Sequence, residues 1–111
     1  MTRLLPCSLL ALSFAATTHA QDAPPTWSHD IAPLVHRACS GCHRPGQPAP
    51  FALLTFDDAW KRRTQLVEVT ESRLMPPWLP VHGEFVDDRR LRDEELALLR
   101  RWADAGGPRG D

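Results

Sequence analysis

Cys39-Ser40-Gly41-Cys42-His43 is the stretch that decides how this 111-residue chain folds. Two cysteines are separated by two residues, and a histidine follows the second cysteine directly. With this spacing, two thiols can reach the two vinyl groups on one edge of a porphyrin, while the next imidazole turns onto the iron from one face. The pattern Cys-x-x-Cys-His is therefore typical of the covalent attachment of a c-type haem.

The first twenty residues predict export across the inner membrane to the periplasm. Arg3 supplies a positive start, an apolar run follows at residues 9–16, and the segment ends in Thr18-His19-Ala20. This is the order of a secretory signal peptide at residues 1–20, with cleavage expected after Ala20. A membrane anchor is the alternative, but the apolar run is too short to span a bilayer. Export removes Cys7 with the signal and brings the other two cysteines into an oxidising compartment.

The composition of the mature chain excludes some partners. Cleavage removes Arg3 from the 13 basic residues and none of the 14 acidic ones, so the net charge becomes about −2. A nucleic-acid-binding protein would show a strong basic excess, and we expect no such partner. No stretch of the mature chain is long and apolar enough to cross a membrane. Chains this small usually need a staple, and a haem at the centre of the core would supply one.

The sequence predicts an all-α fold, with about three main helices and proline-rich loops wrapped around one covalently attached haem. The expected segments are an extended lead-in at residues 21–29, one domain at residues 30–107 and a tail at residues 108–111. The sequence contains no convincing strand signal, internal repeat or low-complexity tract.

Helix signals set the expected boundaries. The first helix should begin at Asp30 as N-cap and deliver Cys39 at its end. The second should begin at Thr55, which can form a capping box with Asp58, and run as one helix until it fades at residues 71–74. The last should run from about Asp93 to Asp104. The residues expected on buried faces are Ile31, Leu34, Val35, Ala38, Ala59, Trp60, Arg63, Leu66, Val67, Thr70, Leu96, Leu98, Leu99, Trp102 and Ala103.

Met75 is the only methionine of the mature chain and is the expected distal iron ligand, opposite His43. Two prolines follow it and stiffen the backbone that carries its thioether. A Met/His pair raises the reduction potential, because soft sulfur favours ferrous iron. A packing role for Met75 is the alternative, and His82 is the alternative ligand. Trp78 is a candidate to donate its indole N–H to a haem propionate.

Two arginines flank the expected ligands. Arg44 follows His43, and Arg73 precedes Met75 by two residues. Both are candidates to pair with the propionates, because a guanidinium binds a carboxylate through two parallel hydrogen bonds. Solvent exposure is the alternative for each.

Two other interpretations of Cys39 and Cys42 stay open at this point. A thioredoxin-like dithiol would follow a strand and open a helix, whereas this pair closes a predicted helix. A zinc site would recruit His36 or His43 beside the two cysteines, but it gives the Met-Pro-Pro segment no role.

The order of these segments resembles a monohaem class I cytochrome c domain of the bacterial periplasmic type. The resemblance covers nearly all of the mature chain. It is carried by Cys39-Ser40-Gly41-Cys42-His43, by Met75-Pro76-Pro77-Trp78 and by the acidic-start helix that continues through Leu98 to Gly106. One departure is Arg92, where such domains often place Ser or Thr before the last helix, so Asp93 is expected to take over as the cap.

The resemblance has specific implications for the site. It implies thioether bonds at Cys39 and Cys42, axial ligation by His43 and Met75, and a Pro45 carbonyl that accepts a hydrogen bond from the His43 ring. It also implies that the first and last helices cross beside the haem edge. The expected activity is one-electron transfer to redox partner proteins through that edge, with no catalytic residue beyond the haem. The alternatives are the haem domain of a larger periplasmic oxidoreductase and a haem protein that binds small ligands or reacts with peroxide.

Overall fold

The computed structural model describes residues 23–80 and 83–111. Within these ranges the regular structure is helical and no strand occurs, which confirms the predicted all-α class. The expected signal peptide at residues 1–20 and the alternative ligand His82 lie outside the described residues. Among the described helices, none has the length and apolar character needed to cross a membrane.

The first helical segment begins earlier than predicted. A single π-helical turn, Trp27–Ile31, runs directly into α1, Ala32–Ala38, so the extended lead-in does not reach residue 29. Asp30 is not the N-cap. Its Oδ2 instead accepts a hydrogen bond of 2.8 Å from the backbone N–H of Thr26, and this bond is the main cause that lowers the pKa of Asp30.

Contacts far along the chain explain the early start. The backbone N–H groups of Trp27 and Ser28 donate to the carbonyls of Pro108 and Arg109, each at 2.9 Å. The Trp27 ring is buried and lies 6.3 Å from the Trp102 ring. The segments predicted as a lead-in and a tail therefore pair with each other, and this pairing extends the ordered domain at both ends.

The second predicted helix is two helices, α2, Phe56–Trp60, and α3, Arg63–Glu71. The predicted capping box is confirmed, because Thr55 and Asp58 exchange backbone-to-side-chain hydrogen bonds of 3.0 and 3.2 Å. The continuous helix is wrong, since Arg62 leaves helical geometry at φ −111° and ψ 11°. After the break, α3 packs on α4, while Phe56 of α2 meets Trp27. One straight helix would not serve both contacts.

The last helix, α4, spans Asp93–Asp104 as predicted. Its N-cap residue is Arg92, not Asp93, and the Glu95 carboxylate accepts the Arg92 backbone N–H at 2.9 Å. The guanidinium of Arg37 on α1 reaches the same Glu95 carboxylate at 2.7 Å, so the first and last helices are in contact.

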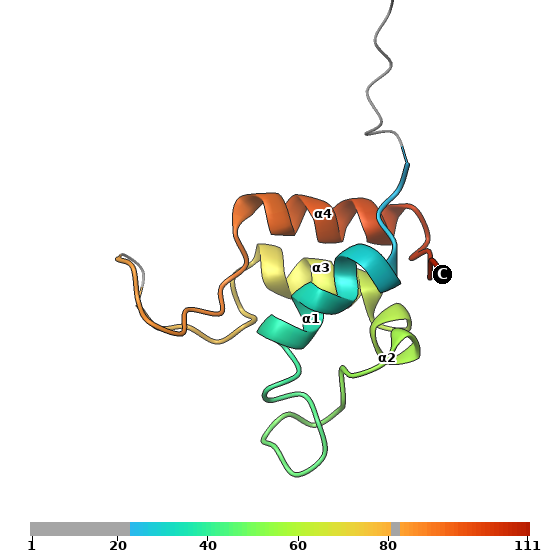
Figure 1. Cartoon of the computed structure of the whole chain (residues 1–111). Coiled ribbons are helices and arrows are strands. Elements are labelled where there is room, and N and C mark those ends of the chain that lie inside the picture. Colours follow the sequence, from blue (N-terminus) through green and yellow to red (C-terminus); the bar gives the residue numbers. More distant parts are fainter. Residues whose placement is uncertain (1–22, 81–82) are drawn as a thin grey trace, which may run out of the picture.

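The helices form a layer that leaves both long loops at one end. Figure 1 shows α4 running alongside α3, with the loop after α1 and the loop between α3 and α4 leaving the end where α1 and α3 finish. The core between the helices is apolar and centres on the fully buried Trp102. Its other large members are Trp27, Ile31, Leu34, Val35, Leu53, Leu66, Val67, Leu91 and Leu99. Trp60, predicted to be buried, is 42% exposed and donates its indole N–H to the Gly106 carbonyl.

Gly106 and Gly107 end α4 with positive φ angles of 85° and 70°. We predict that Gly107→Ala lowers the free energy of unfolding by about 3 kcal/mol, through left-handed strain plus overpacking. An added Cβ would come within 2.8 Å of Trp60 Cδ1. Gly106→Ala is the matched control, because its Cβ would meet open space, and only the strain of about 1–2 kcal/mol is expected. Denaturant unfolding measures both, and equal losses would contradict the packing argument.

Candidate functional site

The attachment motif forms a compact turn at the end of α1, as predicted. Cys39 is the C-cap residue, and its backbone N–H donates to the Val35 carbonyl at 2.8 Å. The backbone N–H groups of Cys42 and His43 both donate back to the Cys39 carbonyl, at 3.2 and 3.0 Å. The helix therefore delivers the first cysteine, and the turn brings the second cysteine and the histidine close behind it.

The loop that follows this turn is closed at its neck. Ser40 is buried, and its hydroxyl donates to the Leu53 carbonyl at 2.6 Å. The Leu53 backbone N–H donates in turn to the His43 carbonyl at 2.8 Å. These bonds hold Leu53 against the motif. The two ends of the proline-rich loop between His43 and Leu53 are therefore fixed beside each other.

The neck decides which carbonyl holds His43. Nδ1 of the imidazole lies 3.1 Å from the Phe51 carbonyl oxygen, and the two rings are 4.7 Å apart. The prediction that the Pro45 carbonyl accepts a hydrogen bond from the His43 ring is therefore wrong. Pro45 is exposed and lies in the first part of the loop. Phe51 lies near the end of the loop, two residues before Leu53, where the chain comes back beside the motif. With Nδ1 engaged, Nε2 is the ring nitrogen left to bind a ligand.

A cavity of about 720 Å³ lies beside the motif, within the range of about 300–1,000 Å³ of small-molecule sites. It brings together five of the predicted residues from two distant segments, namely Cys39, Cys42, His43, Met75 and Trp78. Its apolar walls include Ala38, Leu53, Leu66, Val69 and Leu74. The cavity therefore joins the two sequence motifs that were identified separately.

Met75 enters the cavity from the end of α3. Its backbone N–H donates to the Val69 carbonyl at 2.9 Å, which fixes the chain as it leaves the helix. Pro76 and Pro77 also line the cavity, so the stiff segment lies in the wall. His43 and Met75 thus line one cavity from different loops.

Among the described residues, Trp78 carries a buried hydrogen-bond donor without a partner. Its indole Nε1 is fully buried, and no described residue accepts a hydrogen bond from it. Buried donors are nearly always paired in native proteins. Because this atom is closed off from the cavity as well as from solvent, the ring would have to shift before a bound carboxylate could accept this N–H.

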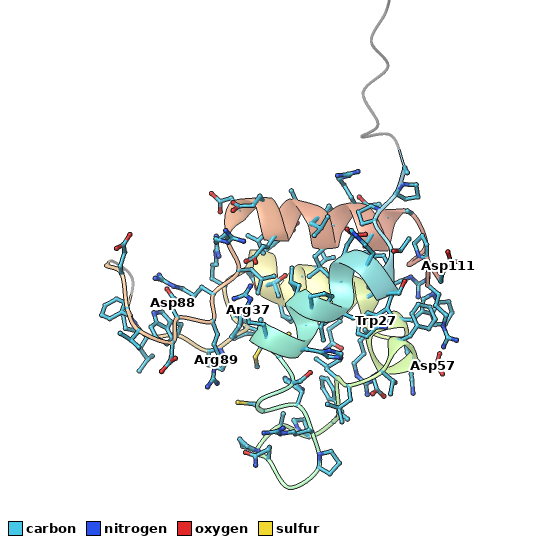
Figure 2. All side chains as sticks on the ribbon, viewed as in Figure 1. Trp27, Arg37, Asp57, Asp88, Arg89 and Asp111 are labelled. Atoms are coloured by element: carbon cyan, nitrogen blue, oxygen red, sulfur yellow. The ribbon has the colours of Figure 1, made fainter. Side chains whose placement is uncertain are left out.

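The arginines at the cavity differ from those predicted. Arg44 and Arg73 are not part of its lining, and the Arg73 guanidinium instead binds the Leu91 carbonyl and the Asp93 carboxylate at 2.6 and 3.0 Å. Arg62 and Arg89 line the cavity in their place. Nη1 of Arg89 lies 3.9 Å from Cys42 Sγ, and Figure 2 shows Arg89 on the loop before α4. Their place at the cavity was not predicted, because both reach the site from segments far from the two ligands.

The surroundings of the two cysteines bear on the two alternative chemistries. Cys39 and Cys42 are free thiols, and burial raises the pKa of Cys39 to about 11 against a smaller opposing effect of Arg37. A dithiol oxidoreductase needs a lowered thiol pKa. For zinc, the described residues contain no group of three or more His, Cys, Asp or Glu side chains that could hold a metal ion. His36 is exposed, and its Nε2 lies 3.0 Å from the Leu54 carbonyl.

No family model, curated protein or solved structure matches this chain. The site is therefore interpreted from its own residues. Two thiols, an imidazole with one nitrogen left over and a thioether line one apolar cavity. This donor set fits a haem with two thioether bonds, one nitrogen ligand and one sulfur ligand.

Substitution of Trp78 tests whether its indole N–H has a partner in the purified protein, because the sign of the change in unfolding free energy depends on it. We expect Trp78→Phe to lower the free energy of unfolding of the purified protein by about 1.5–3 kcal/mol, since a bound carboxylate would lose a charge-assisted hydrogen bond. If nothing accepts from this N–H, the same substitution removes an unsatisfied buried donor and is neutral or stabilising. Denaturant unfolding distinguishes the two results.

Proposed function

We propose that the exported chain is a one-electron carrier that holds a single c-type haem covalently. The observation that carries this proposal is the shared cavity, which is lined by both cysteines of the motif, by His43 and by Met75. A bound haem would supply a reversible change between ferric and ferrous iron, which is the chemistry of an electron carrier.

Each ligand would have its own support. Cys39 and Cys42 would hold the group from the end of α1, and the turn between them is fixed by backbone bonds to the Cys39 carbonyl. His43 would bind through Nε2, because the Phe51 carbonyl engages Nδ1. A hydrogen-bonded Nδ1–H strengthens the imidazole as a donor and fixes its orientation. Met75 would bind from the other loop, where its thioether favours the reduced state.

The lining explains why the group would carry electrons and not bind a substrate. The walls are mostly aliphatic and aromatic, and they come from α1, α3 and both long loops. If His43 and Met75 both bound the group, these two side chains would occupy the places that a substrate would otherwise take. The apolar walls would also restrict water, which tunes the reduction potential.

Covalent haem in the exported protein is the first test. We expect a pyridine haemochrome assay on the periplasmic fraction to show one covalent haem per chain. Cys39→Ser or Cys42→Ser should shift the haemochrome band to longer wavelength, because one vinyl group stays unreacted. Cys7→Ser is the matched control and should leave the yield unchanged, since Cys7 lies in the expected signal peptide. A wild-type protein without covalent haem refutes the proposal and reopens the zinc and dithiol interpretations.

Met75 provides a prediction about ligation. We expect Met75→Ala to abolish the weak far-red band of the ferric protein and to lower the reduction potential, within the roughly 0.8 V range over which axial ligands tune haem. Leu79→Ala is the control, because Leu79 is 96% exposed on the same loop and does not line the cavity. Visible spectra and potentiometry measure both variants. An unchanged spectrum and potential in Met75→Ala would exclude Met75 as the distal ligand and favour His82.

A further inference from the structure

Arg62 occupies the helix break that the sequence did not predict. It is the N-cap residue of α3, half-buried, and its side chain lines the cavity beside the motif. In a continuous helix, Arg62 would lie off the buried face, in solvent. The break therefore has a consequence for the site, because it brings a guanidinium to a wall that is otherwise mostly apolar.

The guanidinium lies directly over Phe51. The distance from Arg62 Cζ to the centre of the Phe51 ring is 4.0 Å, within the range of about 6 Å for a cation–π contact. Nη1 of Arg62 also lies 3.4 Å from the Asp58 carbonyl, which ties the guanidinium to α2. Asp58 in turn accepts the backbone N–H groups of Leu54 and Thr55, where the loop ends. Arg62 thus has fixed partners on both sides.

Phe51 touches His43 in two ways. Its ring lies 4.7 Å from the imidazole at an interplanar angle of 42°, and its carbonyl engages Nδ1 at 3.1 Å. Any movement of Phe51 would disturb both contacts. Arg62, Phe51 and His43 therefore form a continuous series of contacts, from the helix break to the proposed iron ligand.

We propose that Arg62 is a positioning residue for His43, and that it acts by holding Phe51 against the imidazole. This inference rests on the proposed haem function. Arg62 keeps the Phe51 carbonyl on Nδ1, which leaves Nε2 aimed at the iron and maintains the donor strength of the imidazole. The helix break is the local structure that makes this contact available.

Arg63 provides a matched control on the same helix. Its Cζ lies 4.5 Å from the centre of the Trp60 ring, so it makes the same kind of contact, but it does not line the cavity. A variant of Arg63 therefore removes one charge and one cation–π contact without touching Phe51. Any effect common to both variants reflects charge or stability and not the position of His43.

The test is the rate at which the His43 Nδ1–H exchanges with solvent, measured by NMR on the reduced, haem-loaded protein. We expect Arg62→Gln to raise this rate about ten-fold, the fold-change that corresponds to losing one typical hydrogen bond. Arg63→Gln should stay within about two-fold of wild type, and Arg62→Lys should restore most of the protection because a cation returns over the ring.

A double-variant cycle separates positioning from a direct effect of charge. Phe51→Leu removes the ring, so Arg62→Gln in that background should raise the rate no further. A role of Arg62 through its charge alone would give the same factor in both backgrounds. The Trp102 indole N–H, which donates to the Pro108 carbonyl at 2.9 Å, reports general loosening in the same spectrum and should keep its rate.

Three results would overturn the proposal. These are an unchanged rate in Arg62→Gln, equal factors with and without the Phe51 ring, and an equal acceleration at the Trp102 N–H. Each of them leaves the haem function intact, because covalent haem is established separately by the haemochrome assay. A wild-type protein without covalent haem would remove both the proposed function and the role of Arg62.

Discussion

The closed neck of the loop after α1 is the constraint on which the site depends. The buried Ser40 hydroxyl holds the Leu53 carbonyl, and the Leu53 N–H holds the His43 carbonyl. Both bonds are shielded from water, where a lost partner leaves a buried polar group unsatisfied at a cost of about 1–3 kcal/mol. Because these two bonds fix Leu53, the Phe51 carbonyl lies beside the His43 imidazole and fixes the orientation of that ring.

Features that depend only on residues close together in the sequence were predicted correctly. The turn of the Cys-x-x-Cys-His motif, the capping box of Thr55 and Asp58, and the limits of α4 were all predicted correctly. A capping box depends on side chains three residues apart, and a helix stop depends on glycines that accept positive φ. Neither needs a partner from elsewhere in the chain. One further prediction was correct. The assumption that a single cofactor uses four side chains predicted that they meet at one cavity, namely Cys39, Cys42, His43 and Met75.

The errors share a different physical origin. The helix begins at Trp27 because the Pro108 and Arg109 carbonyls accept its first N–H groups. The second helix breaks because α2 and α3 pack on different neighbours. The Phe51 carbonyl replaces that of Pro45 because Leu53 closes the loop. Each outcome is set by contacts between segments far apart in sequence, and no periodicity or spacing within one segment carries that information.

The distribution of packing gives a physical reason for a covalent cofactor. Near the termini, α4 packs on α3 and on the π-helical turn before α1, around a core that includes the fully buried Trp102 and Ile31. At the end where α1 and α3 finish, these two helices and the two long loops line a cavity of about 720 Å³. A group that binds only the folded state stabilises it more as its effective concentration rises relative to its Kd. Thioether bonds at Cys39 and Cys42 would keep that concentration permanently high. Loops with little core of their own would then hold His43 and Met75 in place.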